Sequence, residues 1–213
     1  MIELIIWDWN GTLLDDLDLG YSLLNDALRN EGLNELENIS KYKNVFEFPV
    51  IEMYRKLGFN CDEKNFDKIS SNYIQNYMKS YEASSMLHNE AIDLLQYFMD
   101  KGIKNTLMSA SQIKILLKQA SFFKCDHLFD ELVGVSDIYA SSKQDEALNW
   151  IKTCDVPLDR IVWVGDSTHD YECAVALGVR CILIDHGHQS YEVLSKCNNE
   201  IIHNLNELKE KLA

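Results

Sequence analysis

Four short stretches place acidic, hydroxyl or lysine side chains directly beside apolar runs. The first is IIWDWNGTLLDD, in which Asp8 is followed by Asn10 and Thr12. Alternate residues of an extended chain point the same way, so Asp8 and Asn10 project to one side. The last stretch is GDSTHD, where helical spacing would bring Asp166 and Asp170 to one side. Such carboxylates suit Mg²⁺, which typically binds one or two carboxylates together with water and substrate phosphate.

The two stretches between them could hold a phosphate group. Ser109 closes NTLMS, and its hydroxyl with the following amides at a helix start could bind phosphate oxygens. Lys143 opens a helical stretch, where a cation opposes the helix dipole unless it has a buried anionic partner. Each stretch also has an ordinary interpretation: an Asn-Gly turn at DWNGT, a helix cap at Ser109 or Asp166, or a solvated lysine.

These residues are expected to lie on alternating strands and helices. Apolar runs at residues 3–9, 105–109, 131–135, 161–164, 181–184 and 200–202 are typical of buried strands. Apolar residues three and four apart, as at 91–98 before Gly102, predict helices between them. The pattern predicts an α/β fold, with a Rossmann-like three-layer core around a mostly parallel sheet. Ligands bind such sheets at the carboxyl ends of the strands, where Asp8, Ser109 and Asp166 occur.

Residues 17–84 interrupt this alternation. Apolar stripes with helical spacing occur at 23–28, 50–57 and 66–77, and no strand is evident among them. We therefore predict an inserted all-helical cap domain at residues 17–84. The catalytic core would comprise residues 1–16 and 85–213.

Composition narrows the classes of partner. The 213 residues, 46% of them hydrophobic, can bury one core with a small appended domain. A formal net charge of −14 without a Lys/Arg cluster argues against nucleic acid as a partner. No apolar run approaches the roughly 20 residues of a membrane span, and the start lacks a signal-peptide pattern, so we expect a cytoplasmic protein without a membrane partner. The loop DHGHQS, residues 185–190, is expected to be solvated at the rim of the site.

Taken together, DWNGT, LMS, a lysine before a helix and VGDSTHD resemble, in order and spacing, the four motifs of the haloacid dehalogenase-like superfamily of phosphohydrolases. The insertion resembles the helical cap of its phosphoglycolate phosphatase and β-phosphoglucomutase branch. The resemblance implies a magnesium-dependent phosphatase that acts on a small phosphorylated metabolite. The sequence is equally compatible with a monomer and a homodimer.

The resemblance also implies a role for each motif residue. Asp8 would be the nucleophile that becomes an aspartyl phosphate, and Lys143 would offset the charge on Asp8 and on the transferring group. The Mg²⁺ ligands would be Asp8, the backbone carbonyl of Asn10, and Asp166, supported by Asp170. The phosphate contacts would come from Thr12, Ser109, the amide of Ala110, and Lys143.

Asn10 departs from the pattern of the family. Most of its phosphatases carry aspartate there, which protonates the leaving group and then activates water, and asparagine can do neither. We expect slow turnover of alkyl phosphates, because general acid–base catalysis is typically worth about 10²- to 10⁴-fold. Among relatives without the acid, dehalogenases lack the magnesium residues, and phosphoryl-transfer ATPases are membrane proteins.

Two alternatives stay open. Phosphonoacetaldehyde hydrolase carries a similar motif and breaks a C–P bond with the help of a cap lysine that forms a Schiff base. The cap here contains Lys41, Lys43 and Lys56, and nothing in the sequence singles one out. The other alternative is a protein that binds phosphorylated ligands without turning them over.

Overall fold

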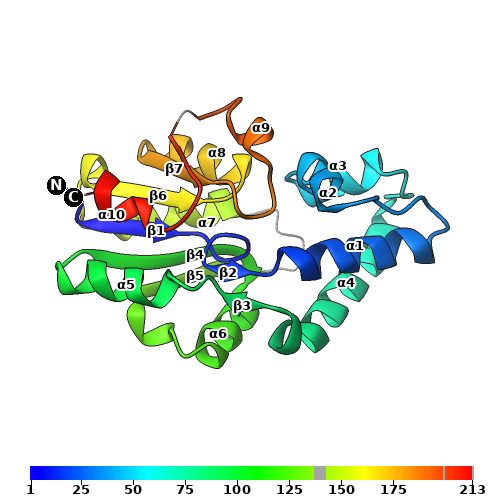
Figure 1. The fold of residues 1–213 in the computed structure, drawn as a ribbon, viewed down its shortest axis with the longest axis horizontal. Coiled ribbons are helices and arrows are strands. Elements are labelled where there is room, and N and C mark those ends of the chain that lie inside the picture. The colour runs from blue at the N-terminus through cyan, green and yellow to red at the C-terminus, as the bar shows by residue number, and fades with distance from the viewer. Residues whose placement is uncertain (137–142, 199, 213) are drawn as a thin grey trace.

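The computed structural model describes residues 1–136, 143–198 and 200–212. Its centre is a six-stranded sheet in the order β5-β4-β1-β6-β7-β8, in which every neighbouring pair is parallel (Figure 1). The predicted α/β fold is confirmed, and each predicted apolar run contains or overlaps one strand. The strands are β1 (Leu4–Trp7), β4 (Lys104–Gln112), β5 (Glu131–Val135), β6 (Ile161–Gly165), β7 (Arg180–Ile184) and β8 (Ile201–Ile202).

Helices cover both faces of this sheet (Figure 1). They are α5 (Ala91–Asp100), α6 (Ile113–Phe122), α7 (Lys143–Trp150), α8 (Thr168–Leu177), α9 (Tyr191–Leu194) and α10 (Glu207–Lys211). Single 3-10 turns occur at Asp126–Leu128, Ile151–Thr153 and Leu158–Arg160.

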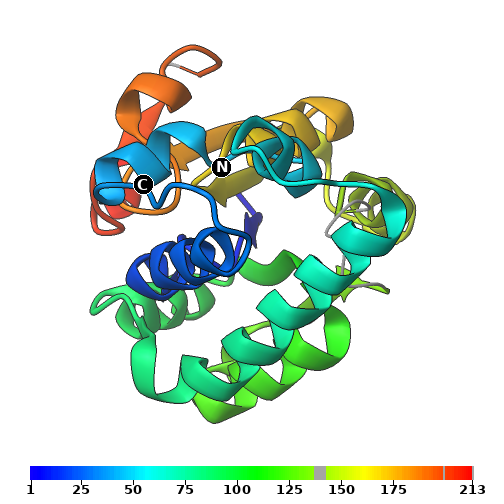
Figure 2. The same ribbon diagram turned by 90° about the vertical axis from the view of Figure 1, so that its right-hand side faces the viewer.

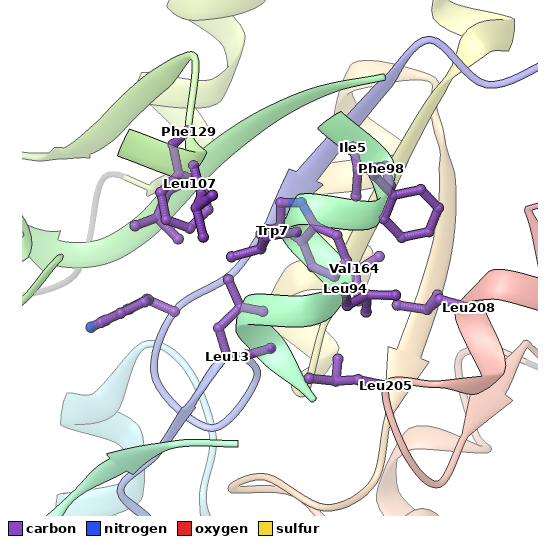
Figure 3. Close-up of a cluster of buried hydrophobic side chains, with 14 of the residues drawn as sticks. Ile5, Trp7, Leu13, Leu94, Phe98, Leu107, Phe129, Val164, Leu205 and Leu208 are labelled. Atoms are coloured by element: carbon purple, nitrogen blue, oxygen red, sulfur yellow. The ribbon is translucent and has the colours of Figure 1, made fainter. Parts of the chain in front are cut away.

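The central strand β1 is fully buried because its alternating side chains enter two different apolar clusters. Ile5 and Trp7 pack with residues of α5, α6 and α10, a cluster shown in Figure 3. Leu4 and Ile6 pack on the other face with residues of α7 and α8. This period of two is the signature of a strand covered on both sides. The residue that follows β1, Asp8, is thereby held at the carboxyl edge of the sheet.

Four helices form the segment between two short strands, β2 (Leu14–Asp15) and β3 (Met86–Leu87), which pair antiparallel and were not predicted. The helices share an apolar cluster that is distinct from those of the sheet and includes residues of all four. This arrangement supports the proposed division into a core and a cap at residues 17–84. The four helices are α1 (Leu17–Asn30), α2 (Ile39–Val45), α3 (Val50–Lys56) and α4 (Glu63–Ser84).

The helix α2 lacked a visible apolar stripe in the sequence because Tyr42 is its only buried residue. Figure 2 shows the cap facing the viewer, with α1 and α4 as its longest helices. None of the described helices combines the length and the apolar character that crossing a bilayer requires.

Candidate active site

Asp8 lies between two strand ends and beside a buried lysine. Its backbone N–H donates to the carbonyl of Val164 at 2.9 Å, which extends the pairing of β1 with β6 by one residue. The Nζ atom of Lys143 lies 2.5 Å from Oδ1 of Asp8 and 2.6 Å from Oδ1 of Asp170. Burial alone would lower the pKa of Lys143, but the two carboxylates raise it. Lys143 is 2% exposed, so it is a buried cation and not the solvated lysine of the ordinary interpretation.

Three buried carboxylates meet at this point. Oxygen atoms of Asp8, Asp166 and Asp170 lie within 4.8 Å of one another, and within the described part of the chain they are the only such group of potential metal ligands. Burial raises the pKa of Asp8 well above its usual value, with a further contribution from Asp170 that Lys143 partly offsets. Burial likewise raises the pKa of Asp166 to about 6. One lysine against three carboxylates leaves excess negative charge, which fits a divalent cation with oxygen ligands.

The hydrogen bonds of Asp170 favour a role in holding Lys143. Its Oδ1 accepts from Lys143 and from the indole N–H of Trp163, at 2.6 and 3.1 Å. Its Oδ2 accepts from the backbone N–H and the hydroxyl of Ser167, at 3.0 and 2.5 Å. Ser167 is the N-cap of α8 and forms a capping box with Asp170, so the helix-cap interpretation of Asp166 is wrong. Asp166 instead points into the site.

The predicted phosphate contacts occupy different positions. Ser109 and Ala110 line the cavity above Asp8. The strand β4 continues to Gln112 and α6 begins at Ile113, so the expected helix start directly after Ser109 is wrong. Thr12 is fully buried, and its hydroxyl lies 3.5 Å from Oδ2 of Asp8 and 3.3 Å from Oδ1 of Asp166. Thr12 thus bridges two carboxylates and does not line the cavity.

The side chain of Asn10 is fixed by partners on both sides of its amide. Its Nδ2 donates to Oδ2 of Asp16 at 2.7 Å and to the hydroxyl of Tyr77 at 2.8 Å. Its Oδ1 accepts from the hydroxyl of Ser111 at 3.0 Å. Asp16 is 3% exposed and also accepts from Tyr77 and from the backbone N–H of Gly11. An amide at position 10 therefore supplies one of the donors that satisfy this buried carboxylate.

The prediction that the loop at residues 185–190 is solvated is wrong. His188 is 5% exposed, and its ring lies between Oδ1 of Asp16, 3.1 Å away, and the hydroxyl of Tyr42, 2.9 Å away. Burial alone would lower the pKa of His188, but Asp16 raises it to about 9. The backbone N–H of His188 donates to Asp166. The loop is buried because the cap helix α2 packs on it, a contact that a polar local sequence does not reveal.

In the sequence, Gly187 is the residue that could have indicated that this loop packs closely against the site. A Cβ there would lie 2.2 Å from Oδ2 of Asp166 and 2.4 Å from the carbonyl oxygen of Gly11. Only a glycine permits the backbone to approach the carboxylate this closely. Sequence reasoning missed Asp16 and His188 as parts of the site, because their partnership joins segments 172 residues apart.

A cavity of about 170 Å³ lies between this site and the cap. Its floor includes Asp8, Lys143 and Asp166, and its walls come mainly from α1, α2, α3, α4 and the turn between α2 and α3. Among the described residues, none of the three cap lysines considered above lines it. Lys43 donates to the carbonyl of Asp185, and Lys56 pairs with Glu47.

Comparison with known proteins identifies this architecture. The family model of the haloacid dehalogenase-like hydrolases matches residues 5–184. The chain belongs to the haloacid dehalogenase-like hydrolases. The matched range contains Asp8, Lys143 and Asp166, so the family assignment covers the whole carboxylate–lysine cluster.

Several relatives of this haloacid dehalogenase-like hydrolase are named as phosphatases. The phosphoglycolate phosphatase of Pseudomonas fluorescens strain Pf0-1 is 22% identical over 194 residues, which cover 87% of this chain and 70% of the relative. The phosphoglycolate phosphatase of Aliivibrio fischeri is 23% identical and covers 94% and 92%. The chain is thus an enzyme of a hydrolase family whose named relatives include phosphatases.

Solved structures show the same fold in proteins named for different reactions. A predicted phosphatase from Clostridium acetobutylicum superposes with a TM-score of 0.86 at 20% identity, over 100% of this chain and 98% of that one. Protein Tyrosine Kinase A of Mycobacterium tuberculosis superposes with a TM-score of 0.82, also at 20% identity and with the same coverage. At this identity the likeness shows the fold and leaves the reaction to be argued from the site.

Proposed function

We propose that this enzyme is a magnesium-dependent phosphatase that hydrolyses a small phosphorylated metabolite through an aspartyl phosphate on Asp8. The observation that carries the proposal is the buried Asp8 carboxylate at the floor of the cavity, bound to Lys143 and adjacent to Asp166. A nucleophile is of no use to a protein that only binds a ligand. The names of the relatives agree with phosphate ester hydrolysis.

Binding of the phosphate would bring its phosphorus atom to Asp8. Ser109 and the amide of Ala110 would contact the phosphate oxygens, and Lys143 would offset negative charge on Asp8 and on the transferring group. Asp8, Asp166 and the backbone carbonyl of Asn10 would hold Mg²⁺. The ion would supply further neutralisation of the phosphoryl oxygens.

In the first step an oxygen of Asp8 forms a bond to phosphorus, and the bond between phosphorus and the leaving oxygen breaks with its electron pair on that oxygen. In the second step water attacks the aspartyl phosphate, releases inorganic phosphate and restores the carboxylate of Asp8. Asn10 can neither protonate the leaving oxygen nor accept the proton of the water. Both steps therefore rely on charge neutralisation and positioning, and turnover is slow where the leaving group needs a proton.

The two alternatives lack such support. A Schiff base in the cap requires a lysine amine in the cavity, and the cap residues that line the described cavity include no lysine. A binding protein would not need the short contact between Lys143 and Asp8, which places a cation on the oxygen that would attack.

Release of inorganic phosphate from a panel of phosphorylated metabolites, with Mg²⁺ and with EDTA, tests the proposal. We expect Mg²⁺-dependent release that Asp8→Asn abolishes. The matched control is Asp93→Asn, which makes the same change on the exposed face of α5 and should leave release unchanged. Activity that survives Asp8→Asn would exclude the nucleophile, and calorimetric binding without release over hours would favour the binding protein.

A further inference from the structure

The cap side of the cavity is aromatic and carries no charge. Its contributions from α1–α4 are apolar or hydroxyl-bearing apart from one glycine, and among the described lining residues the cap supplies no lysine, arginine or carboxylate. Aromatic side chains dominate the wall, and edge-to-face or offset contacts make such walls favourable for a further ring. The six aromatic residues are Tyr42, Phe46, Phe48, Tyr54, Tyr73 and Tyr77.

The cations near the cavity are already paired. Lys143 binds Asp8 and Asp170, and its place at the floor assigns it to the phosphate end. His188 faces Asp16 at 3.1 Å. A carboxylate or second phosphate on the substrate would lose its hydration in this wall without gaining a cation, which is costly for a buried charge. The geometry selects an uncharged leaving group.

Asn10 adds an independent constraint on the same leaving group. Because the amide donates no proton, the oxygen must depart as an anion or take its proton from water. The pKa of a phenol is about 10, whereas alkoxides resemble hydroxide, for which the corresponding value in water is about 15.7. A phenoxide therefore leaves without protonation far more readily than an alkoxide.

The size of the cavity agrees with a ring. Its volume is about 170 Å³, close to the roughly 150 Å³ of an apolar protein cavity that holds one benzene molecule. This volume is of the order that one aromatic ring occupies, so a single-ring leaving group is compatible with the space between the cap and Asp8.

From these observations we propose that the substrate is the phosphate monoester of an uncharged, single-ring phenol. The inference rests on the proposed phosphatase function and narrows it to an aryl phosphate. It differs from the phosphoglycolate of the named relatives, whose carboxylate would face the uncharged wall. The phosphate would sit at Asp8 and Lys143, and the ring would pack among the aromatic residues of the cap.

Four compounds, assayed with the Mg²⁺-loaded wild-type enzyme, test the effect of the leaving group separately from the effect of the uncharged aromatic wall. Phenyl phosphate and benzyl phosphate carry the same ring but leave as a phenoxide and an alkoxide, and we expect kcat/KM to be at least about 100-fold higher for phenyl phosphate, the lower end of what a general acid contributes. Benzyl phosphate and ethyl phosphate leave as similar alkoxides, and we expect at least about a 10-fold preference for the ring. Phenyl phosphate should exceed 4-carboxyphenyl phosphate by at least about 10-fold, mainly in KM, although the carboxylate does not worsen the leaving group.

A substitution in the wall tests the charge argument directly. Ile74 lines the cavity from α4 and is half-buried, so Ile74→Lys can place an ammonium in the wall without disrupting a core. We expect this variant to lose or reverse the discrimination against 4-carboxyphenyl phosphate. The matched control Ile74→Leu should keep the wild-type ratio of the two substrates.

The outcomes distinguish this inference from the function on which it rests. If these compounds release no phosphate while the panel of phosphorylated metabolites shows Mg²⁺-dependent release, the enzyme is a phosphatase and the aryl assignment is wrong. If the panel releases none either, the proposed function is wrong. If ethyl phosphate or phosphoglycolate is hydrolysed as efficiently as phenyl phosphate, the enzyme is a phosphatase and the aryl assignment is overturned. Equal kcat/KM for phenyl and 4-carboxyphenyl phosphate would also overturn it, by removing the uncharged wall as a determinant.

Discussion

Replacing Asn10 with aspartate would restore the acid of the family but would bring two carboxylates together. The Nδ2 atom of Asn10 lies 2.7 Å from Oδ2 of Asp16, and both side chains are held by further hydrogen bonds. In Asn10→Asp an oxygen would replace that nitrogen. Like charges this close in a buried site strongly raise one of the two pKa values.

The size of the effect follows from two competing costs. Two unit charges 2.7 Å apart repel by about 6 kcal/mol at an effective dielectric constant of about 20. The new carboxyl can avoid this by binding a proton, which at pH 7 costs about 4 kcal/mol for a group with an ordinary pKa near 3.9. The smaller cost applies, so we expect Asn10→Asp to lower the free energy of unfolding by about 4 kcal/mol at pH 7.

The pH dependence identifies the cause. The pKa of the new carboxyl is raised in the folded state, so the unfolded state loses its proton first as pH increases, and stability relative to wild type falls. The deficit should grow by about 1.4 kcal/mol per pH unit between pH 5 and 8 and should nearly vanish near pH 4. Urea unfolding of both proteins in EDTA at pH 5, 6, 7 and 8 measures it.

The control for this experiment is Asn10→Ala. It removes the amide that serves Asp16 and Tyr77 without adding a charge, so its deficit relative to wild type should not vary with pH in this way. A deficit of Asn10→Asp that is constant from pH 5 to 8 would contradict the predicted repulsion between the two carboxyl groups. It would mean that Asp16 and the new side chain do not share the site.

Three further predictions concern turnover and stability. Asn10→Asp should raise the rate on alkyl phosphates by about 10²- to 10⁴-fold and help aryl phosphates less, and an unchanged alkyl rate would contradict the missing-acid argument. Lys143→Met should lower kcat by about 10²- to 10³-fold in phosphate-release assays, with a larger loss than for Lys152→Met on the surface. Asp16 raises the pKa of His188 to about 9, so the protonated ring stabilises the folded state by on the order of 3 kcal/mol. This contribution is complete below pH 6.5 and is lost as pH rises to 9. Urea unfolding of His188→Gln should not show this loss.

The sequence predicts the sheet well because its central strands β1 and β6 are buried on both faces. Such strands are nearly continuous apolar runs, as in residues 161–164, and their ends can be located to within a few residues. The positions of Asp8 and Asp166 follow, since parallel neighbours end at the same edge. The apolar stripes of α1, α3 and α4 are visible for a similar reason, whereas α2 buries only Tyr42 and leaves no pattern.

The burial of charged residues could not be read from local sequence. Lys143 is equally compatible with a surface helix until Asp8, 135 residues away, is known to contact it. His188 lies in a polar loop and is buried only because Tyr42 and Phe46 of the cap pack against its ring. These contacts join distant segments, and local composition carries no information about them.

The amide at position 10 is explained by the charge balance of the buried site. Four buried carboxylates already surround two cations in the described structure: Asp8, Asp16, Asp166 and Asp170 around Lys143 and His188. A carboxylate at position 10 would be the fifth, and one of its oxygens would face Oδ2 of Asp16 in place of the donor nitrogen. The amide instead donates to Asp16, so a buried acid at position 16 and a catalytic acid at position 10 are competing uses of one site. Exchanging the two groups, in Asn10→Asp combined with Asp16→Asn, keeps one amide donor and one carboxylate in the pair and should remove the pH-dependent repulsion that Asn10→Asp introduces alone.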